Sequence, residues 1–132
     1  MVIDFKLKPY EWQKKMDIIM QNVNLNQVKT MGTFAMAFEF RNSYDGNHYK
    51  KIVCNSVWKL SSDMCFSTGD EFPFFICDIR VAKLENAEIE AAFKMLNYGL
   101  SIPHSKEYYL LCMDSGDISI SLICEKIEVL DM

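Results

Sequence analysis

The stretch TFAMAFEFR (residues 33–41), followed by NSYDGN (42–47) and YKKIVCNSVWKL (49–60), decides the fold of this chain. In the first segment large apolar side chains alternate with small or polar ones, which is the period-two pattern of a half-buried strand. Asp45-Gly46 in the second segment supplies the positive φ that a tight reversal needs. The whole stretch therefore predicts a β-hairpin. In its second strand one face is expected to carry Ile52, Cys54, Trp58 and Leu60, and the other Val53 and Val57.

Further strands are predicted on both sides of this hairpin. Residues 2–8 have the alternation of a short strand, residues 61–71 look irregular, and residues 64–66 could form a short edge strand. Residues 72–81 read as an aromatic-rich strand with Pro73 at its start or on an edge, and the apolar run 74–77 is typical of a strand covered on both faces. Residues 107–113 and 118–122 are strands around a turn at 114–117. The apolar alternation then changes phase, which predicts a bulge or bend near 122–124.

Two helices are predicted from apolar residues at helical spacing. The first spans residues 9–22, because Pro9 suits a first turn and Trp12, Met16, Ile19, Met20 and Val23 form one stripe. The second spans residues 86–98, with Asn86 as the N-cap and Gly99 as the stop. The predicted fold is a single globular α+β domain over residues 1–132. It has a mainly antiparallel sheet of about five to six strands with two helices packed on it, in the order (β)α-β-β-β-α-β-β.

The charges are distributed unevenly along the chain. Residues 1–60 contain nine Lys and Arg against five Asp and Glu, whereas residues 61–132 contain five against thirteen. Arg41 and Arg80 are the two arginines, and the net charge is −4 at pH 7. Nucleic-acid binding usually needs arginine forks on a basic face, so it is not expected. A strongly acidic half favours a basic protein partner instead.

Targeting signals and cysteine motifs also limit the class of protein. The N-terminal residues alternate charged and apolar side chains, unlike a secretory signal peptide, and no apolar run approaches the ~18 residues of a membrane span. The five cysteines are never closer than eleven positions, which excludes CxxC zinc or redox motifs. We therefore expect reduced cysteines in a cytoplasmic protein, with four of them mostly buried: Cys54, Cys77, Cys112 and Cys124.

No residue pattern predicts catalysis, a metal site or a cofactor. His48 and His104 are the only histidines, each in a predicted turn or loop, and the sequence leaves open whether either meets a cysteine or a carboxylate. Asp114 and Asp117 bracket a Ser-Gly turn, where local hydrogen bonding explains them better than a calcium site with its six to eight oxygen ligands. Neither of the glycine-rich phosphate-binding patterns, GxxxxGK[ST] and GxGxxG, occurs.

The sequence favours a non-enzymatic acidic protein-binding module. In its general type (short, acidic, α+β, without a catalytic set) the chain is similar to bacterial immunity proteins, an analogy of class that covers no specific residues. Such a module would inhibit a basic toxin or nuclease domain through charge complementarity. The alternative is a small-molecule-binding or oligomeric regulatory domain with a pocket between sheet and helices, and homo-oligomerisation stays open. The expected partner-binding residues lie in loops or turns: Asp63, Asp70, Glu71, Phe72, Asp114 and Asp117.

Overall fold

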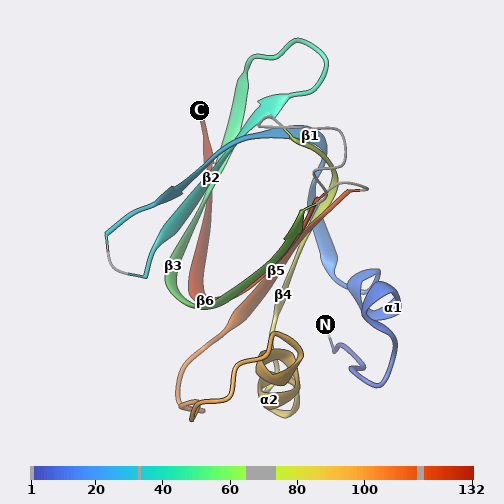
Figure 1. Cartoon of the computed structure of the whole chain (residues 1–132), viewed down its shortest axis with the longest axis vertical. Coiled ribbons are helices and arrows are strands. Elements are labelled where there is room, and N and C mark those ends of the chain that lie inside the picture. Colours follow the sequence, from blue (N-terminus) through green and yellow to red (C-terminus); the bar gives the residue numbers. More distant parts are fainter. Residues whose placement is uncertain (1, 33, 65–73, 116–117) are drawn as a thin grey trace.

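The structure is a computed structural model that describes residues 2–32, 34–64, 74–115 and 118–132. Its strands are β1 (Asp17–Thr30), β2 (Met36–Asn42), β3 (His48–Met64), β4 (Phe74–Lys83), β5 (Tyr109–Asp114) and β6 (Ile118–Asp131). Two helices accompany them, α1 (Pro9–Gln13) before the first strand and α2 (Asn86–Met95) between β4 and β5 (Figure 1). The predicted α+β class with a mainly antiparallel sheet of six strands is confirmed, because each of the six ladders is antiparallel.

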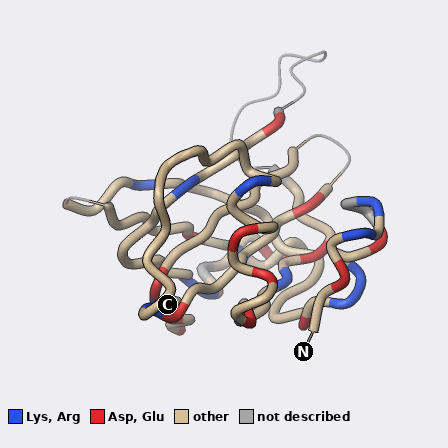
Figure 2. Tube along the Cα trace, turned by 90° about the horizontal axis from the view of Figure 1, so that it is seen from below, with Lys and Arg blue, Asp and Glu red and all other residues tan. Residues whose placement is uncertain are grey.

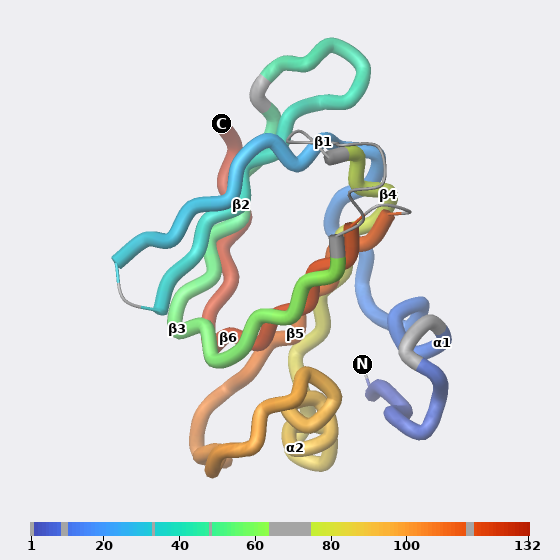
Figure 3. The backbone as a smooth tube through the Cα atoms, in the orientation of Figure 1, coloured from blue at the N-terminus to red at the C-terminus, as the bar shows by residue number. Residues whose placement is uncertain are grey.

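The strands close into a barrel in the order β1-β2-β3-β6-β5-β4, which the sequence did not predict. The ladders divide the barrel into two sheets that share three long strands. One sheet contains the second half of β1, then β2, the first half of β3 and the end of β6. The other contains the first half of β1, then β4, β5, the first half of β6 and the second half of β3. Figure 3 shows β3 and β6 bending together where they pass from one sheet to the other.

The bends in β1 and β3 are made by residues with left-handed backbone. Asn22 in β1 and Ser56 in β3 each have φ of 54°, and register shifts follow between Leu25 and Gln27 and between Val57 and Lys59. Strands that turn a corner between two sheets commonly do so through bulges of this kind. At each corner the alternation of faces is interrupted, so residues three apart point into the same core.

The predicted helix over residues 9–22 is present only in its first five residues. α1 ends at Gln13, and residues 17–22 belong to β1. The corner at Asn22 explains the error, because Met20 and Val23 both point into the barrel although they are three residues apart. A bent strand thereby imitates the spacing of a helical stripe. The predicted strand over residues 2–8 is also absent, and that segment contains turns and bends.

An apolar core fills the barrel. Its fully buried side chains come from all six strands and include Phe38 and Phe40, as the hairpin pattern predicted. Ile52 and Cys54 share this interior, but Trp58 lies on the outer face, because the left-handed residue Ser56 between Cys54 and Val57 reverses the pattern. The predicted grouping of Trp58 with Ile52 and Cys54 was therefore wrong.

A second core lies outside the barrel wall, where the helices pack (Figure 1). Trp12 of α1 and Phe93 of α2 are buried there against outward-facing residues of β4, β5 and β6, among them Ala82, Leu110 and Ile123. These three strands are therefore covered on both faces where the helices lie. β4 loses this cover towards its start, where Phe75 is 47% exposed and Cys77 is also exposed. The predictions that the 74–77 run is covered on both faces and that Cys77 is buried were wrong.

α2 confirms the second predicted helix and corrects both of its ends. The N-cap is Glu85 rather than Asn86, and the main-chain N–H of Glu85 donates to Oε1 of Glu88 at 2.9 Å. At the other end the left-handed residue is Asn97, with φ of 61°, rather than Gly99. The N–H of Tyr98 bonds to the carbonyl of Phe93 at 2.9 Å, which closes the helix in a Schellman arrangement.

The phase change predicted for the last strand lies slightly later than expected. Ile118, Ile120, Leu122 and Cys124 point into the barrel, and the next inward residue is Ile127. The irregular register belongs to β3, where Trp58 is the extra residue opposite Cys124 and Ile123. In the part of the chain that the structure describes, no helix is long and apolar enough to cross a bilayer.

Candidate functional site

A pocket of about 390 Å³ opens at the corner where β3 and β6 bend together. We call it the corner pocket. Its walls come from the β1–β2 connection, the bend of β3, the end of α2 and the bend of β6. Three of its side chains are aromatic and one is a carboxylate, and its size lies within the range of small-molecule sites. The residues that line it are Phe34, Ser56, Val57, Trp58, Tyr98 and Glu125.

Two of the pocket residues have strained backbone. Phe34 has φ of 62° and Ser56 has φ of 54°, a region that bulky side chains rarely adopt. The carbonyl of Phe34 accepts a hydrogen bond from the N–H of Val57 at 2.7 Å, which fastens the β1–β2 connection to the bend of β3. The Phe34 side chain is nevertheless 72% exposed, so this backbone places a large apolar group at the rim of the pocket rather than in the core. Such strain tends to gather at binding sites.

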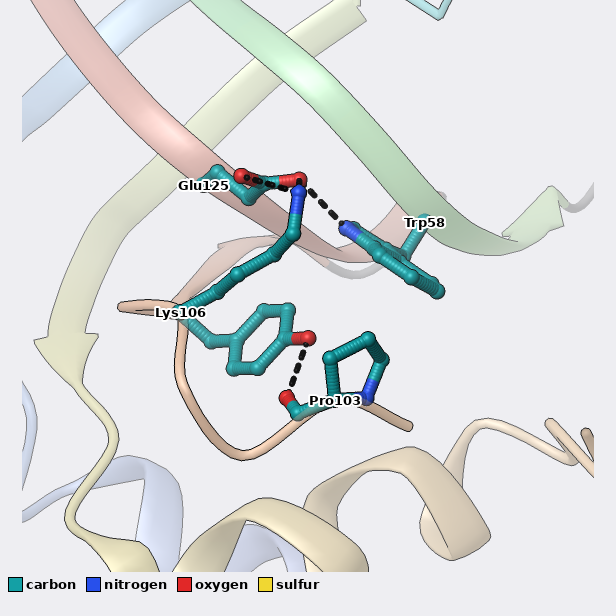
Figure 4. A network of polar contacts seen from close by, with 5 residues as sticks. Trp58, Pro103, Lys106 and Glu125 are labelled. Carbon is teal, nitrogen blue, oxygen red and sulfur yellow. Dashed lines mark hydrogen bonds and ion pairs between the residues drawn. The ribbon is translucent and has the colours of Figure 1, made fainter. Parts of the chain in front are cut away.

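Glu125 supplies the charge of the pocket. Its Oε2 accepts a hydrogen bond from the indole Nε1 of Trp58 at 2.9 Å. Nζ of Lys106 lies 3.3 Å from Oε1 and 3.4 Å from Oε2 of the same carboxylate. Figure 4 shows the Trp58 and Lys106 side chains meeting at Glu125 from different elements. The carboxylate is thus held in one orientation by a neutral donor and a cation.

Aromatic contacts fix the Trp58 ring. It meets Phe93, Tyr98 and Tyr108 edge to face, with ring centroids 6.0, 6.0 and 5.8 Å away. The Tyr108 hydroxyl donates to the carbonyl of Pro103 at 2.7 Å, also drawn in Figure 4. Burial, and next the negative charge of Glu125, raise the pKa of the Tyr108 phenol above its ordinary value. The wall of the corner pocket is therefore built on a rigid aromatic cluster.

A second polar feature crosses the outer face of the barrel. The ladders align Asp63 of β3 with Ser119 of β6, Ser119 with Asp114 of β5, and Asp114 with Asp78 of β4. Residues directly opposite one another in a sheet share a face, so three carboxylates follow one line across four strands. We call Asp63, Asp114 and Asp78 the acidic row. The sequence predicted two of its members as partner-binding residues and missed Asp78.

The negative charge of the acidic row is partly neutralised at Asp78 by Arg80. Nη2 of Arg80 lies 3.0 Å from Oδ2 of Asp78, and Nη1 donates to the Gln13 carbonyl of α1 at 3.1 Å. Hydrogen bonds from Gln21 and Arg80 lower the pKa of Asp78. Burial and the nearby charge of Asp78 raise the pKa of Asp114. The pKa values of these two neighbouring carboxyl groups are thus shifted in opposite directions.

The remaining predicted partner-binding residues, Asp70, Glu71, Phe72 and Asp117, lie outside the described residues. Among the described ones, positive and negative residues are interleaved in the view of Figure 2.

His104 does meet a carboxylate, since its Nε2 is 3.3 Å from Oε1 of Glu90, but both side chains are exposed on the surface. Within the residues that the structure describes, no group of three His, Cys, Asp or Glu side chains is placed to hold a metal ion.

Sequence reasoning missed the corner pocket because its residues come from four separate segments. Phe34 and Val57 looked like ordinary strand positions, and Glu125 followed an apolar strand without any motif. The one available signal was the change of apolar phase near Cys124. That change marks the bend of β6 where the pocket forms.

The comparisons with known proteins describe a family and a fold. A protein-family model whose description reads only "-like" matches residues 18–131. A search of curated proteins finds no match. A crystal structure of an uncharacterized protein from Neisseria gonorrhoeae is similar, with a TM-score of 0.63 and 20% identity. The similarity covers 86% of this chain and 94% of that one, which extends the barrel fold to that protein.

Proposed function

The chain belongs to the family matched over residues 18–131, and we propose that it is a non-enzymatic binding domain whose ligand enters the corner pocket. The observation that carries this proposal is the combination of strained backbone at Phe34 and Ser56 with an aromatic-walled pocket around Trp58. Keeping a phenylalanine exposed in left-handed backbone costs stability, and a ligand that covers the ring would offset that cost.

The proposal assigns the pocket a small molecule with an apolar or aromatic body. The volume of about 390 Å³ is near the lower end of the range for such sites. Trp58, Phe34 and Tyr98 offer ring faces and edges, and the single carboxylate of Glu125 would orient the ligand. This is the arrangement of mostly apolar walls with few polar groups that small-molecule sites share.

Intrinsic fluorescence tests the proposal, because the chain has two tryptophans and Trp12, which is buried, does not line the pocket. In a Trp12→Phe variant, titration with 2-phenylethanol should change the emission of Trp58 in a saturable manner. Phe34→Ala and Tyr98→Ala should each weaken this binding several-fold. Tyr44→Ala is the matched control, since Tyr44 is an 89% exposed aromatic residue outside the pocket lining. Equal binding by all variants would contradict the assignment of the pocket.

A second candidate function rests on the acidic row. We propose that a basic protein binds there, which is the electrostatic interaction predicted from the sequence. Asp114 and Asp78 stand directly opposite each other although like charges in that position destabilise a sheet. A retained cost of this kind supports a binding role.

A heptalysine peptide provides the probe for the second candidate. Its binding, followed by fluorescence anisotropy, should weaken in an Asp63→Asn/Asp114→Asn variant and in 0.5 M salt, because screening reduces attraction between exposed charges. Asp131→Asn removes a comparable exposed charge at the end of β6 and should change little. Binding that survives both the double substitution and the salt would rule out the acidic row as the basis of the interaction.

We also propose a cytoplasmic, reducing location. The cysteines among the described residues, Cys54, Cys77, Cys112 and Cys124, are free thiols, which supports this location. Thiols of the protein isolated under alkylating conditions should be fully modified after denaturation without a reductant. Recovery of a disulfide-linked peptide under those conditions would contradict the proposed location.

A further inference from the structure

The carboxylate that lines the corner pocket, that of Glu125, is already paired with an ammonium group of the protein itself. Nζ of Lys106 lies 3.3 and 3.4 Å from the two oxygens of Glu125. The Lys106 side chain is 45% exposed, whereas that of Glu125 is 24% exposed. The lysine therefore reaches from solvent to a carboxylate that is fixed in the pocket wall. This contact shows that an alkylammonium ion can pair with the Glu125 carboxylate in its present orientation.

The carboxylate is held more firmly than the lysine. Glu125 belongs to β6 and is oriented by the indole N–H of Trp58, whose ring is packed against Phe93 and Tyr108. Lys106 lies on the connection between α2 and β5, and its side chain is more exposed to water than that of Glu125. A partly exposed ion pair of this type contributes little to stability, because water solvates the separated charges nearly as well. Lys106 can therefore leave Glu125 at small cost, whereas Glu125 stays in place.

We propose that the corner pocket binds a primary amine with an apolar or aromatic stem, and that the ligand ammonium replaces Lys106 on Glu125. The stem would lie against Phe34 and Tyr98, and the ammonium would donate to the carboxylate. Aromatic rings attract cations as well as apolar groups, so the walls favour the same ligand class. This inference rests on the proposed function of the pocket and adds the charge and the donor group of its ligand.

Three probes of similar shape separate the effect of ligand charge on affinity from the effect of ligand shape. They are 2-phenylethylammonium, its neutral analogue 2-phenylethanol and the anion 3-phenylpropanoate, each titrated into the Trp12→Phe protein with Trp58 emission and calorimetry as readouts. The amine should bind at least about tenfold more tightly than the alcohol, as expected for a charge-assisted hydrogen bond to a carboxylate. The anion should bind more weakly than the alcohol. Nα-acetyl-lysine methylamide tests whether a lysine side chain of a protein serves as well as a free aromatic amine.

Two substitutions should act in opposite directions on the amine. Glu125→Gln retains an acceptor for the Trp58 indole and removes the charge, so it should reduce amine affinity about tenfold and leave alcohol affinity unchanged. Lys106→Met removes the internal competitor and keeps a long apolar stem. It should raise amine affinity about threefold or more, with no gain for the alcohol, since only the amine competes for the carboxylate.

The same strand offers a matched control pair. Nζ of Lys126 lies 2.9 Å from Oε1 of Glu128, and neither residue lines the pocket. Lys126→Met and Glu128→Gln make the same chemical changes and should leave the affinities of all three probes unaltered. This control separates a local effect at the site from a change in the overall charge of the protein.

The outcomes distinguish the inference from the proposed function. If the alcohol and the amine bind equally and Phe34→Ala weakens both, the pocket is a binding site and the ammonium preference is wrong. If Lys106→Met weakens binding and the anion binds best, the ligand is an acid that pairs with Lys106, which also overturns the inference. If no probe perturbs Trp58 or releases heat, both the inference and the pocket function fail.

Discussion

Glu88 of α2 accepts a hydrogen bond from the main-chain N–H of Ile3, which lies 85 positions earlier in the sequence. The other oxygen of the same carboxylate accepts the N–H of Glu85 at the start of the helix. Glu88 is only 3% exposed and is the one buried charged residue among the described part of the chain. One side chain thus caps a helix and fastens the N-terminal segment to it.

Glu88→Ala should lower the free energy of unfolding by about 1–3 kcal/mol, because the buried N–H of Ile3 and the partly buried N–H of Glu85 lose their acceptor. Glu90→Ala, on the exposed side of the same helix, should change stability by less than about 0.5 kcal/mol. Urea unfolding measures both effects. Hydrogen exchange at the Ile3 amide should accelerate in Glu88→Ala only, and unchanged exchange there would contradict the bond between the two segments.

The thiols should divide into one fast and three slow classes. In a Cys65→Ser background, Cys77 is exposed and should react quickly with a thiol reagent. Burial raises the pKa of Cys112 to about 12, and a hydrogen bond with Cys124 together with burial raises that of Cys54. The thiolate is the reactive form, so these buried groups should react only after denaturation. Native titration of more than one fast thiol would contradict this division.

Phe93→Ala should cost about 3–5 kcal/mol in urea unfolding, because Phe93 is fully buried between α2 and the barrel. Phe75→Ala, which removes a 47% exposed ring from β4, provides the matched comparison and should cost less than about 1 kcal/mol. Similar losses for both variants would mean that the outer core does not depend on the α2 ring.

The pH dependence of stability should differ in sign for the two opposed aspartates. The folded-state pKa of Asp114 is raised above its ordinary 3.8, so its ionised form opposes folding at neutral pH. Asp114→Asn should therefore add roughly 0.2–1 kcal/mol at pH 7, a gain that disappears as pH falls below the ordinary value.

The pKa of Asp78 is lowered, so its contribution to stability is present above pH 3.8 and is lost as pH falls through the folded value. Asp78→Asn should accordingly destabilise the protein at pH 7, and this effect should shrink as the pH falls below 3.8. Denaturant titrations at pH 7, 4 and 2 measure both variants. The same sign of effect at pH 7 would contradict the assignment.

The central hairpin was predictable because its alternation is strict where no corner interrupts it. Phe38 and Phe40 lie two residues apart and both enter the core, and the Asp45-Gly46 turn follows as its residue types require. α2 was predictable for the same reason, since Ile89, Ala92 and Phe93 form a regular stripe. The period of the apolar residues alone identifies a helix or strand wherever one of its faces is uniformly buried.

The corners were not predictable from period. Met20 and Val23, Cys54 and Val57, and Cys124 and Ile127 are each three apart and face the same interior. Left-handed backbone at Asn22 and Ser56 lies between the members of the first two pairs, and neither residue is a glycine that would have signalled it. The closed barrel and the corner pocket both depend on these bends, so neither could be derived from apolar spacing.

The unequal ladders of β6 have a consequence for aggregation. β5 pairs with this strand only to Cys124, whereas β3 accompanies it to Asp131, so the far edge of residues 126–131 has no strand beside it in the described part of the chain. An open edge invites pairing with another molecule. Here that edge carries the ion pair of Lys126 and Glu128 and ends at Asp131. Another strand that paired with this edge would have to desolvate these charges. Residues 126–131 of β6 are thus unpaired along one edge, but their charges make this edge a poor template for fibril growth.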